Sequence, residues 1–530
     1  MINLLASMPR SSIANIQARL VPLLRLDVLG LLPDEVALQV LSHLPWRALI
    51  NCFGVCRRWR ALASDASLWR ALCQGRKWEW RKGMPSRAGA EHYSVSGDSD
   101  DEGMGDEEED DVVEQMLLDD SGFTSMAVTR EATQASTSHS HIIKAWHTQG
   151  RHHMRTRLPI PTIFRHPYSP SLLKPDYKHL FATHIRLRNR FLSASYSLST
   201  LQTRGATNGH SNTIYCLQLY TYPDTGVQVL FTGSKDTSIR EWDMATGTVR
   251  RVIQGVHGGS VLSICAFNGL LASGGSDRTV VVWDLATGQP VRVIRDHEDS
   301  VLCVRFNEHR LVSCSKDRTL RTYLLPDFTP QFRLEDHRAA VNAISMSEKI
   351  IVSGSGDRSM KIWNAETGEL VRTFENHHGR GLAAIDFEFP YVLSGSSDKH
   401  LRLVDITTDR GWSTSPEMDE TATARAARGD VCQTCGSIPQ AGRLAQKTHE
   451  DLVRSVVLNT DFVVSGSYDH TVKVWDRETG TLVADLAGGH IGRIFCVGFD
   501  HSKIVSCGED QRICVWDFSH GIDTSFVKLQ

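Results

Sequence analysis

Histidine, hydroxyl and aspartate side chains recur at fixed spacing through the C-terminal part of this 530-residue chain. Serine, histidine and aspartate are the residue types of a hydrolase triad, in which a base activates a nucleophile and a carboxylate orients the base. Seven repeats carry the set, however, and seven copies of one active site argue against catalysis. We therefore predict a structural network in which each Asp accepts from a His, the His contacts the hydroxyl, and the hydroxyl contacts a Trp indole.

The spacing of this set is regular. The recurring acids are Asp236, Asp277, Asp317, Asp357, Asp398, Asp469 and Asp510. Four positions before each of them stand Thr232, Ser273, Ser313, Ser353, Ser394, Ser465 and Ser506. The histidine stands twenty positions before the Asp, or twenty-six in the first repeat, at His210, His257, His297, His337, His378, His449 and His490. Six positions after the Asp stand Trp242, Trp283, Tyr323, Trp363, Val404, Trp475 and Trp516. We predict weaker networks in the repeats with Tyr323 and Val404.

The repeat length indicates how the chain positions these residues. Successive Asp residues lie 40 or 41 positions apart, except for one gap of 71, and short alternating strands lie between them. This pattern resembles an all-β, seven-bladed WD-repeat β-propeller, which we place at residues 205–530. The long gap leaves an inserted loop at 407–441, which we predict to be disordered. It contains Cys432 and Cys435, but a structural zinc site needs four ligands, so we predict no metal and no cofactor.

A second set of motifs lies near the N-terminus. Apolar periodicity predicts two or three short helices within 31–75, one of them mostly buried with Val36, Leu38 and Val40. The motifs Leu32-Pro33-Asp34-Glu35, Leu44-Pro45, Val55-Cys56-Arg57-Arg58-Trp59 and Leu68-Trp69 make residues 31–80 resemble a small all-α F-box, with a generic helical module as the alternative. The resemblance implies that an Skp-type adaptor binds through Leu32, Pro33, Leu44, Pro45, Val55, Trp59, Leu68 and Trp69.

The segments around these domains differ in charge. Residues 1–30 include a helical pattern that either covers the next domain or forms a homodimer. Residues 86–140 are predicted to be disordered, because they are rich in Ser, Gly, Asp and Glu, and 98–120 alone hold thirteen acids without one Lys or Arg. Residues 141–204 form a basic connector to the propeller.

Composition argues against several classes of function. The net charge of −3 argues against nucleic-acid binding as the main task. We find neither a signal peptide nor a stretch approaching eighteen apolar residues, so we expect no membrane span. Reduced cysteines and a location in the cytoplasm and/or nucleus are expected. The chain also lacks a nucleophile elbow and a Gly-rich phosphate loop, so we predict that it is not an enzyme.

Basic and hydroxyl residues are predicted to converge on one rim of the propeller. The residue just before each turn Asp should lie on the same face as the residues that begin each repeat's first strand. Together these positions hold five cations, at Lys235, Lys316, Arg380, Arg454 and Arg493, against the single acid Glu509. A merely solvated basic surface is one interpretation. The other is a site for an extended, doubly phosphorylated peptide, whose anionic oxygens suit Arg, Lys and Ser donors.

The stretches VLCVRFNEHRLVSCSKDRTL, DHRAAVNAIS and RGLAAIDF resemble the β-TrCP branch of F-box/WD proteins. That resemblance implies the substrate-recognition subunit of an SCF-type cullin-RING E3 ubiquitin ligase, joined through the Skp adaptor to cullin and RING subunits. It also implies binding of phosphorylated substrates with degrons of the form Asp-pSer-Gly-x-x-pSer. The implied contacts are Tyr215, Lys235, Ser260, Ser276, Lys316, Asn342, Gly356, Arg380, Gly381, Ser397, Leu452, Arg454, Tyr468 and Arg493. Lys235 and Glu509 depart from the family pattern, since Lys235 stands where the family has Arg.

The chain contains a match to that degron at the end of its own acidic segment. Asp120, Ser121, Gly122 and Ser125 have the required spacing, and we hypothesise that they act as a self-degron or pseudosubstrate. Against the ligase interpretation stands a WD-repeat interaction scaffold whose helical module binds no adaptor.

Overall fold

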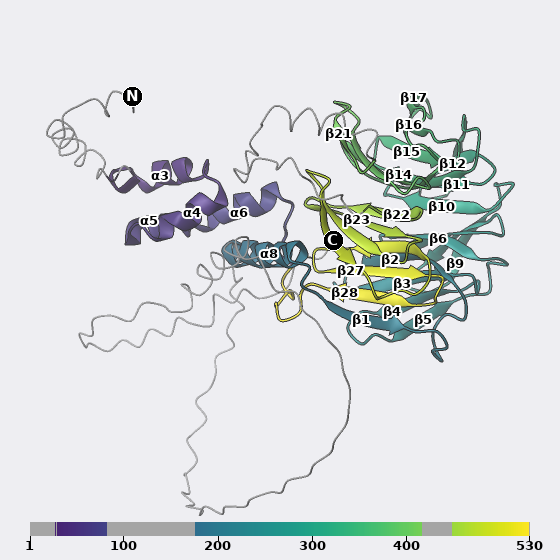
Figure 1. The fold of residues 1–530 in the computed structure, drawn as a ribbon, viewed down its shortest axis with the longest axis horizontal. Coiled ribbons are helices and arrows are strands. Elements are labelled where there is room, and N and C mark those ends of the chain that lie inside the picture. The colour runs from purple at the N-terminus through teal and green to yellow at the C-terminus, as the bar shows by residue number, and fades with distance from the viewer. Residues whose placement is uncertain (1–26, 28, 82–174, 416–447, 529–530) are drawn as a thin grey trace, which may run out of the picture. The chain divides into compact units, whose positions relative to one another are not determined.

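The computed structural model describes residues 27, 29–81, 175–415 and 448–528, which contain a small helical domain and a β-propeller (Figure 1). Most of the predicted N-terminal helical segment, all of the acidic segment 86–140, residues 141–174 of the basic connector, and Cys432 and Cys435 lie outside these residues. Within the described residues, no helix is long and apolar enough to cross a membrane.

The N-terminal domain consists of short helices separated by Pro, Gly and Asp. They are η1 (Leu29–Leu31), α3 (Asp34–Leu41), α4 (Trp46–Phe53), α5 (Arg57–Ala63) and α6 (Ala66–Gly75). Proline precedes α3 and α4, where its missing N–H costs nothing because a helix start has no backbone acceptor for that group. At the start of α6, the Asp65 carboxylate accepts from Ser67 N at 2.8 Å and caps the helix. The prediction that α3 is mostly buried was wrong at two positions, because Val36 and Val40 are 43% and 45% exposed.

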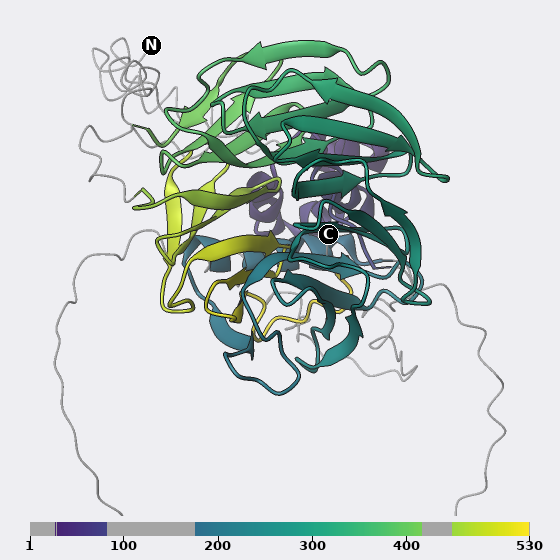
Figure 2. The ribbon, with the colours of Figure 1, turned by 90° about the vertical axis from the view of Figure 1, so that its right-hand side faces the viewer.

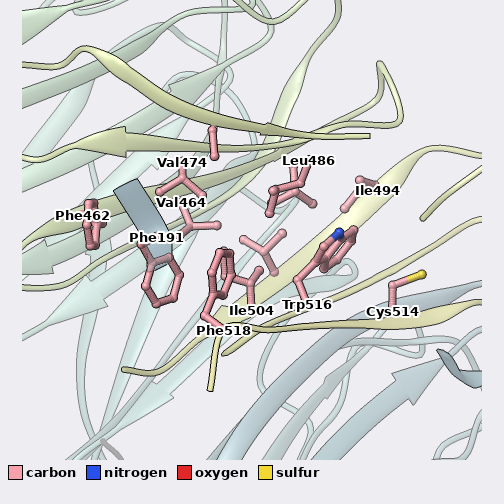
Figure 3. Close-up of a cluster of buried hydrophobic side chains, with 13 residues drawn as sticks. Phe191, Phe462, Val464, Val474, Leu486, Ile494, Ile504, Cys514, Trp516 and Phe518 are labelled. Carbon is pink, nitrogen blue, oxygen red and sulfur yellow. The ribbon is translucent and has the colours of Figure 1, made fainter. Parts of the chain in front are cut away.

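Helix α8 (Tyr177–Leu192) lies in the basic connector and packs against both domains. At its N-terminal half, Phe181 contacts Trp69 and Trp78, with ring centroids 5.3 Å and 5.2 Å away. At its C-terminal end, Phe191 enters a propeller core cluster and stacks on Phe518 at 3.8 Å (Figure 3). Its apolar side chains therefore join the F-box-like helices to the propeller.

Seven four-stranded antiparallel sheets make up the propeller, and Figure 2 shows successive sheets following one another around its axis. The first three blades are β2 (Ile214–Thr221), β3 (Gln228–Ser234), β4 (Ile239–Asp243) and β5 (Val249–Ile253); β6 (Val261–Phe267), β7 (Leu270–Gly275), β8 (Val280–Asp284) and β9 (Pro290–Ile294); β10 (Val301–Phe306), β11 (Arg310–Ser315), β12 (Thr319–Leu324) and β13 (Thr329–Glu335). The next three are β14 (Val341–Met346), β15 (Ile350–Ser355), β16 (Met360–Asn364) and β17 (Leu370–Phe374); β18 (Leu382–Glu388), β19 (Tyr391–Ser396), β20 (Leu401–Asp405) and β21 (Gly411–Ser413); β22 (Val453–Leu458), β23 (Phe462–Ser467), β24 (Val472–Asp476) and β25 (Leu482–Leu486). The seventh blade is β26 (Ile494–Phe499), β27 (Lys503–Gly508), β28 (Ile513–Asp517) and β1 (Ser197–Gln202).

The seventh blade joins the two ends of the repeat region. Strand β1 pairs with β28, so that Leu198 lies opposite Trp516, and this pairing closes the ring with β1 as the outer strand of the blade. The propeller therefore begins before residue 205, where the sequence placed its start, because one strand of the last blade comes from the connector.

Blade five also differs from the prediction. Strand β21 occupies 411–413, within the stretch predicted as an inserted loop at 407–441, and pairs with β20 through Trp412 opposite Leu403. The insertion therefore follows the outer strand of this blade, and residues 416–447 lie outside the described part of the chain.

A tight turn after the second strand of each blade carries the recurring Asp. The residue after this Asp has a left-handed backbone in all seven blades, as in Arg358 at φ 70°. The Asp357 carboxylate accepts from Ser359 N at 2.9 Å and from Ser359 Oγ at 2.7 Å. These bonds stabilise a conformation that side-chain-bearing residues otherwise disfavour.

Candidate functional site

The predicted structural network is present between the strands of the blades. In blade two, His257 Nδ1 lies 3.0 Å from Asp277 Oδ2, and His257 Nε2 lies 2.8 Å from Ser273 Oγ. Trp283 Nε1 donates to the same hydroxyl at 2.8 Å. In blade four, burial lowers the pKa of His337, whereas hydrogen bonds from Ser359, Arg338 and His337 hold the pKa of Asp357 well below its usual range despite burial. The imidazole is thus neutral and the carboxylate ionised, an arrangement that satisfies buried groups.

Three blades depart from this pattern. In blade three, Tyr323 replaces the tryptophan and donates to Asp296 Oδ2 at 3.1 Å. Blade five has Val404 in place of the tryptophan. There, His377 Nε2 takes the place of the indole and lies 3.0 Å from Ser394 Oγ. In blade seven, Trp516 Nε1 is buried without a hydrogen-bond partner in the described structure, which the sequence did not predict.

The two sets of predicted rim residues lie on one face because the same backbone bond joins them in every blade. The residue before the turn Asp donates its N–H to a carbonyl at the start of the blade's first strand. The pairs are Lys235–Thr213 at 2.9 Å, Ser276–Ser260 at 2.8 Å, Lys316–Ser300 at 3.0 Å, Gly356–Ala340 at 2.9 Å, Ser397–Gly381 at 3.1 Å, Tyr468–Leu452 at 3.0 Å and Glu509–Arg493 at 2.9 Å.

A β-bulge near the start of the first strand turns one further side chain per blade toward the axis. Pairing of the first and second strands shifts register there in all seven blades. Such bulges re-aim a side chain. The residues skipped by the register are Tyr215, Leu262, Leu302, Asn342, Ala383, Arg454 and Phe495. All seven line an axial cavity of ≈ 90 Å³.

Three of these bulge residues were predicted contacts, namely Tyr215, Asn342 and Arg454. Arg454 Nη1 donates to the Ala383 carbonyl at 2.9 Å, and Asn342 Nδ2 donates to the Leu382 carbonyl at 2.6 Å. Both side chains are thereby oriented by the first strand of blade five. The sequence did not single out Leu262, Leu302 and Ala383, although each occupies the same place in its repeat.

Four of the five rim cations are exposed, and Arg454 is half-buried. Within the described ranges, Lys235, Lys316 and Arg380 form no ion pair. Arg493 lies 5.2 Å from the centroid of the Tyr468 ring, and its Nε lies 3.9 Å from Glu509 Oε2. The unexpected acid therefore faces one cation, and no carboxylate of the described residues forms an ion pair with the other rim cations.

Aromatic and small residues complete the rim. Phe495 lies between Tyr215 and Tyr468, with ring centroids 5.1 Å and 5.5 Å away. At Gly381, an added Cβ would come within 2.9 Å of Gly356 Cα, so both glycines permit close approach of two blades. The face thus combines cations, hydroxyls and an apolar wall.

The sequence did not single out Arg305 and Asp386, two partly buried ionisable residues on the first strands of blades three and five. Burial raises the pKa of Asp386, while the Leu458 N–H and the Arg305 guanidinium lower it. Arg305 lines the axial cavity, and Asp386 Oδ2 accepts from Leu458 N at 2.9 Å. The sequence does carry a signal for Arg305 and Asp386. Each is a charged residue between apolar residues of a strand, two positions after Cys303 and Ala384 respectively. Among the residues that the structure describes, no group of three or more His, Cys, Asp or Glu could hold a metal ion.

The F-box-like domain presents a separate apolar surface. Leu31 and Val55 are 73% and 57% exposed, Pro33 and Pro45 are exposed, and Leu32, Leu44 and Trp59 are half-buried. Arg58 Nη2 donates to the Leu32 carbonyl at 2.7 Å, and Trp59 Nε1 donates to Asp27 Oδ1 at 2.6 Å. These bonds orient the segment before α3.

Two of the predicted adaptor contacts require correction. Leu68 and Trp69 are 4% and 0% exposed, and Trp69 Nε1 donates to the Ala63 carbonyl at 2.8 Å. Packing against Phe181 of α8 covers Trp69, so we assign both residues to the interior and not to a partner surface. Asp120, Ser121, Gly122 and Ser125 lie outside the described residues.

Comparison with known proteins agrees with both domains. Residues 29–75 match the F-box-like family. Residues 200–243, 248–284, 288–323, 328–364, 443–476 and 480–517 match the WD domain, G-beta repeat. These ranges do not include β18 to β20 of blade five, the blade in which Val404 replaces the tryptophan.

Three curated relatives illustrate the similarity. The probable E3 ubiquitin ligase complex SCF subunit sconB of Talaromyces marneffei is 26% identical over 240 residues, 44% of this chain and 31% of that protein. An F-box protein of Saccharomyces cerevisiae is 36% identical over 52 residues, 10% of this chain and 8% of that protein. The nuclear distribution protein PAC1 of Coccidioides posadasii is 30% identical over 306 residues, 55% of each chain. The chain thus spans less than a third of the length of the first two relatives and about half that of the third. It combines an F-box-like domain with a WD40-repeat propeller and is homologous to the SCF subunit sconB and to the F-box protein of Saccharomyces cerevisiae.

Proposed function

We propose that this chain is the substrate-recognition subunit of an SCF-type ubiquitin ligase. The observation that carries the proposal is the union, in one chain, of an exposed F-box-like surface and a propeller rim with converging cations. The F-box-like domain would bind the Skp adaptor, and through it the cullin and RING subunits. The rim would hold a substrate near the charged conjugating enzyme, which raises the local concentration of a substrate lysine without any chemistry by this chain.

The ligand proposed for the rim is a degron of the form Asp-pSer-Gly-x-x-pSer. Each phosphoserine brings about −1.5 to −2 charges and three acceptor oxygens. Lys235, Lys316 and Arg380 are exposed rim cations that form no ion pair in the described structure, and Arg454 is held in place at the cavity mouth. The aromatic wall around Phe495 would pack against apolar groups of the peptide.

Binding of synthetic peptides tests the rim. A charge-assisted hydrogen bond contributes about 1.5–3 kcal/mol, so Arg380→Ala and Arg454→Ala should each weaken binding of the doubly phosphorylated peptide about 10- to 100-fold. Added salt should weaken binding to the unmodified chain. Arg292, exposed on the outer strand β9, provides the matched control Arg292→Ala, which should bind normally. Equal affinity for the unphosphorylated peptide would refute the degron assignment.

Co-purification with the Skp adaptor tests the other surface and separates the ligase from a plain scaffold. The double variant Leu32→Ala/Pro33→Ala should lose the adaptor while its propeller still binds phosphopeptide. Leu198→Ala, on the exposed face of β1, removes an apolar side chain elsewhere and should retain the adaptor. The scaffold alternative is correct if the unmodified chain retains no adaptor.

The chain's own degron-like motif is proposed to regulate the rim. Phosphorylated Ser121 and Ser125 would compete with substrates in cis, because their place in the same chain, about fifty residues before helix α8, raises the local concentration of the motif at the rim. The variant Ser121→Ala/Ser125→Ala should turn over more slowly and bind substrate more tightly after kinase treatment. Unchanged turnover together with unchanged affinity would contradict the proposal.

A further inference from the structure

One position in the second strand of each blade faces the first strand of the next blade. Glycine occupies it in five blades, at Gly233, Gly274, Gly354, Gly395 and Gly466. A Cβ on any of these glycines would come within 2.5–2.8 Å of a side-chain atom, in each case including one from the neighbouring blade. In the two remaining blades the position holds Cys314 and Cys507, so a larger side chain is accommodated only there.

The residues opposite these two cysteines are also cysteines. The strand registers place Cys303 opposite Cys314 and Cys496 opposite Cys507. The five glycines instead face Cys216, Ser263, Ala343, Ala384 and Ser455. Directly opposed residues in antiparallel strands have Cα atoms about 4.5–5.5 Å apart, and disulfides span about 4.4–6.8 Å. Both pairs therefore have the backbone separation of a disulfide, while all four cysteines are free.

The two pairs differ in their electrostatic surroundings. A hydrogen bond from the Cys314 thiol and the Arg305 guanidinium lower the pKa of Cys303 well below its usual value, against the effect of burial. Burial raises the pKa of Cys496 and of Cys507. Cys303 and Cys496 both line the axial cavity, which gives a small molecule a route to either sulfur, so the pairs differ in their charge surroundings and not in access. The Cys303 sulfur also lies 3.7 Å from the Ile344 carbonyl oxygen. The thiolate is the nucleophilic form of cysteine, so reactivity follows a low pKa and access.

We propose that Cys303 and Cys314 form a peroxide-sensitive thiol pair that closes reversibly into a cross-strand disulfide. The Cys303 thiolate attacks one oxygen of hydrogen peroxide, the O–O bond breaks, and a sulfenic acid and hydroxide result, the latter taking up a proton to become water. The Cys314 sulfur then attacks the sulfenic sulfur, its proton leaves with the displaced hydroxyl as a second water, and the S–S bond forms. Two thiols are oxidised by two electrons, and one peroxide is reduced to two waters.

The disulfide would connect the two strands that end at rim residues Ser300 and Lys316, which are joined by a backbone bond of 3.0 Å. The inference does not depend on the proposed ligase function, because it concerns only the thiols. Cys496–Cys507 is a comparison pair within the same molecule, with the same register but a raised pKa at both sulfurs.

Peptide mapping under non-reducing conditions tests the proposal on the full chain. The reduced protein is exposed to increasing hydrogen peroxide, alkylated and digested, and cross-linked peptides are measured by mass spectrometry. The Cys303–Cys314 peptide should appear with the mass loss of two hydrogen atoms, and dithiothreitol should reverse it. Because the thiolate is the form that attacks peroxide, it should form faster than the Cys496–Cys507 peptide.

Variants that copy the other blades provide the controls. Cys314→Gly should stop the reaction at a Cys303 sulfenic acid, which dimedone traps, and Cys314→Ser serves the same purpose if the glycine variant does not fold. Cys507→Gly should leave the Cys303–Cys314 peptide unchanged. The exposed Cys56 is an internal reference for general oxidation. The proposal is overturned if Cys303 remains alkylatable when Cys56 is fully oxidised, or if the two pairs react at equal rates.

Discussion

Replacing Ser465 by alanine should destabilise the propeller more than the same replacement of Ser506. In blade six, Trp475 Nε1 donates to Ser465 Oγ at 2.9 Å, and His449 Nε2 lies 2.8 Å from the same oxygen. Loss of the hydroxyl leaves two fully buried polar groups unpaired. A buried group without its partner costs about 1–3 kcal/mol, so Ser465→Ala should lower the free energy of unfolding by about 2–6 kcal/mol.

In blade seven the same hydroxyl has fewer partners to lose. His490 Nε2 lies 2.6 Å from Ser506 Oγ, but the Trp516 indole has no hydrogen-bond partner within the described structure even before mutation. Ser506→Ala therefore leaves only one further group unpaired and should cost about 1–3 kcal/mol. The difference between the two variants isolates the contribution of the tryptophan bond.

Urea unfolding followed by tryptophan fluorescence measures both costs. The comparison uses transition midpoints and requires equal m values, which show that the variants expose similar surface on unfolding. Ser273→Ala, whose hydroxyl bonds both His257 and Trp283, should behave like Ser465→Ala. If Ser506→Ala costs as much as Ser465→Ala, the indole bond contributes nothing and the network energetics argued above are wrong.

Three further predictions concern pH, packing and charge. Burial lowers the pKa of His377 to about 3, so near pH 6.5 the unfolded chain takes up a proton at this side chain while the folded chain does not. The free energy of unfolding should therefore fall as the pH drops below 6.5. His377→Gln should flatten this pH dependence, measured as urea midpoints across pH. Gly381→Ala places a methyl group 2.9 Å from Gly356 Cα and should lower the free energy of unfolding, measured in urea, by about 1–3 kcal/mol. Gly379→Ala, whose added methyl group has its nearest atom at 3.7 Å, should lower it less. Equal losses in the two variants would contradict this account. Glu509→Gln removes the carboxylate near Arg493, and because an exposed ion pair contributes about 0–1 kcal/mol, phosphopeptide affinity should rise up to about fivefold at low salt by titration calorimetry.

The sequence predicted local features better than distant contacts. The turn Asp, the preceding hydroxyl and the His twenty positions earlier lie within one blade, so spacing alone was sufficient to predict their contact. The closing strand β1 could not be predicted in this way, because it pairs Leu198 with Trp516, more than three hundred residues later. Trp69 was assigned to a partner surface for the same reason, since α8 covers it and lies about a hundred residues further along the chain.

The positions proposed to bind the ligand are those at which the repeat does not constrain the side chain. The buried Asp, His and hydroxyl positions are nearly invariant among the blades, because each copy must satisfy the same backbone and the same neighbours. The bulge position must only point at the axis, and it holds Tyr, Leu, Leu, Asn, Ala, Arg and Phe in turn. Seven similar folding units can therefore present different side chains to the ligand proposed for the rim. It follows that Arg454, which is unlike every equivalent residue, provides a more specific test of the rim than any residue of the repeated network.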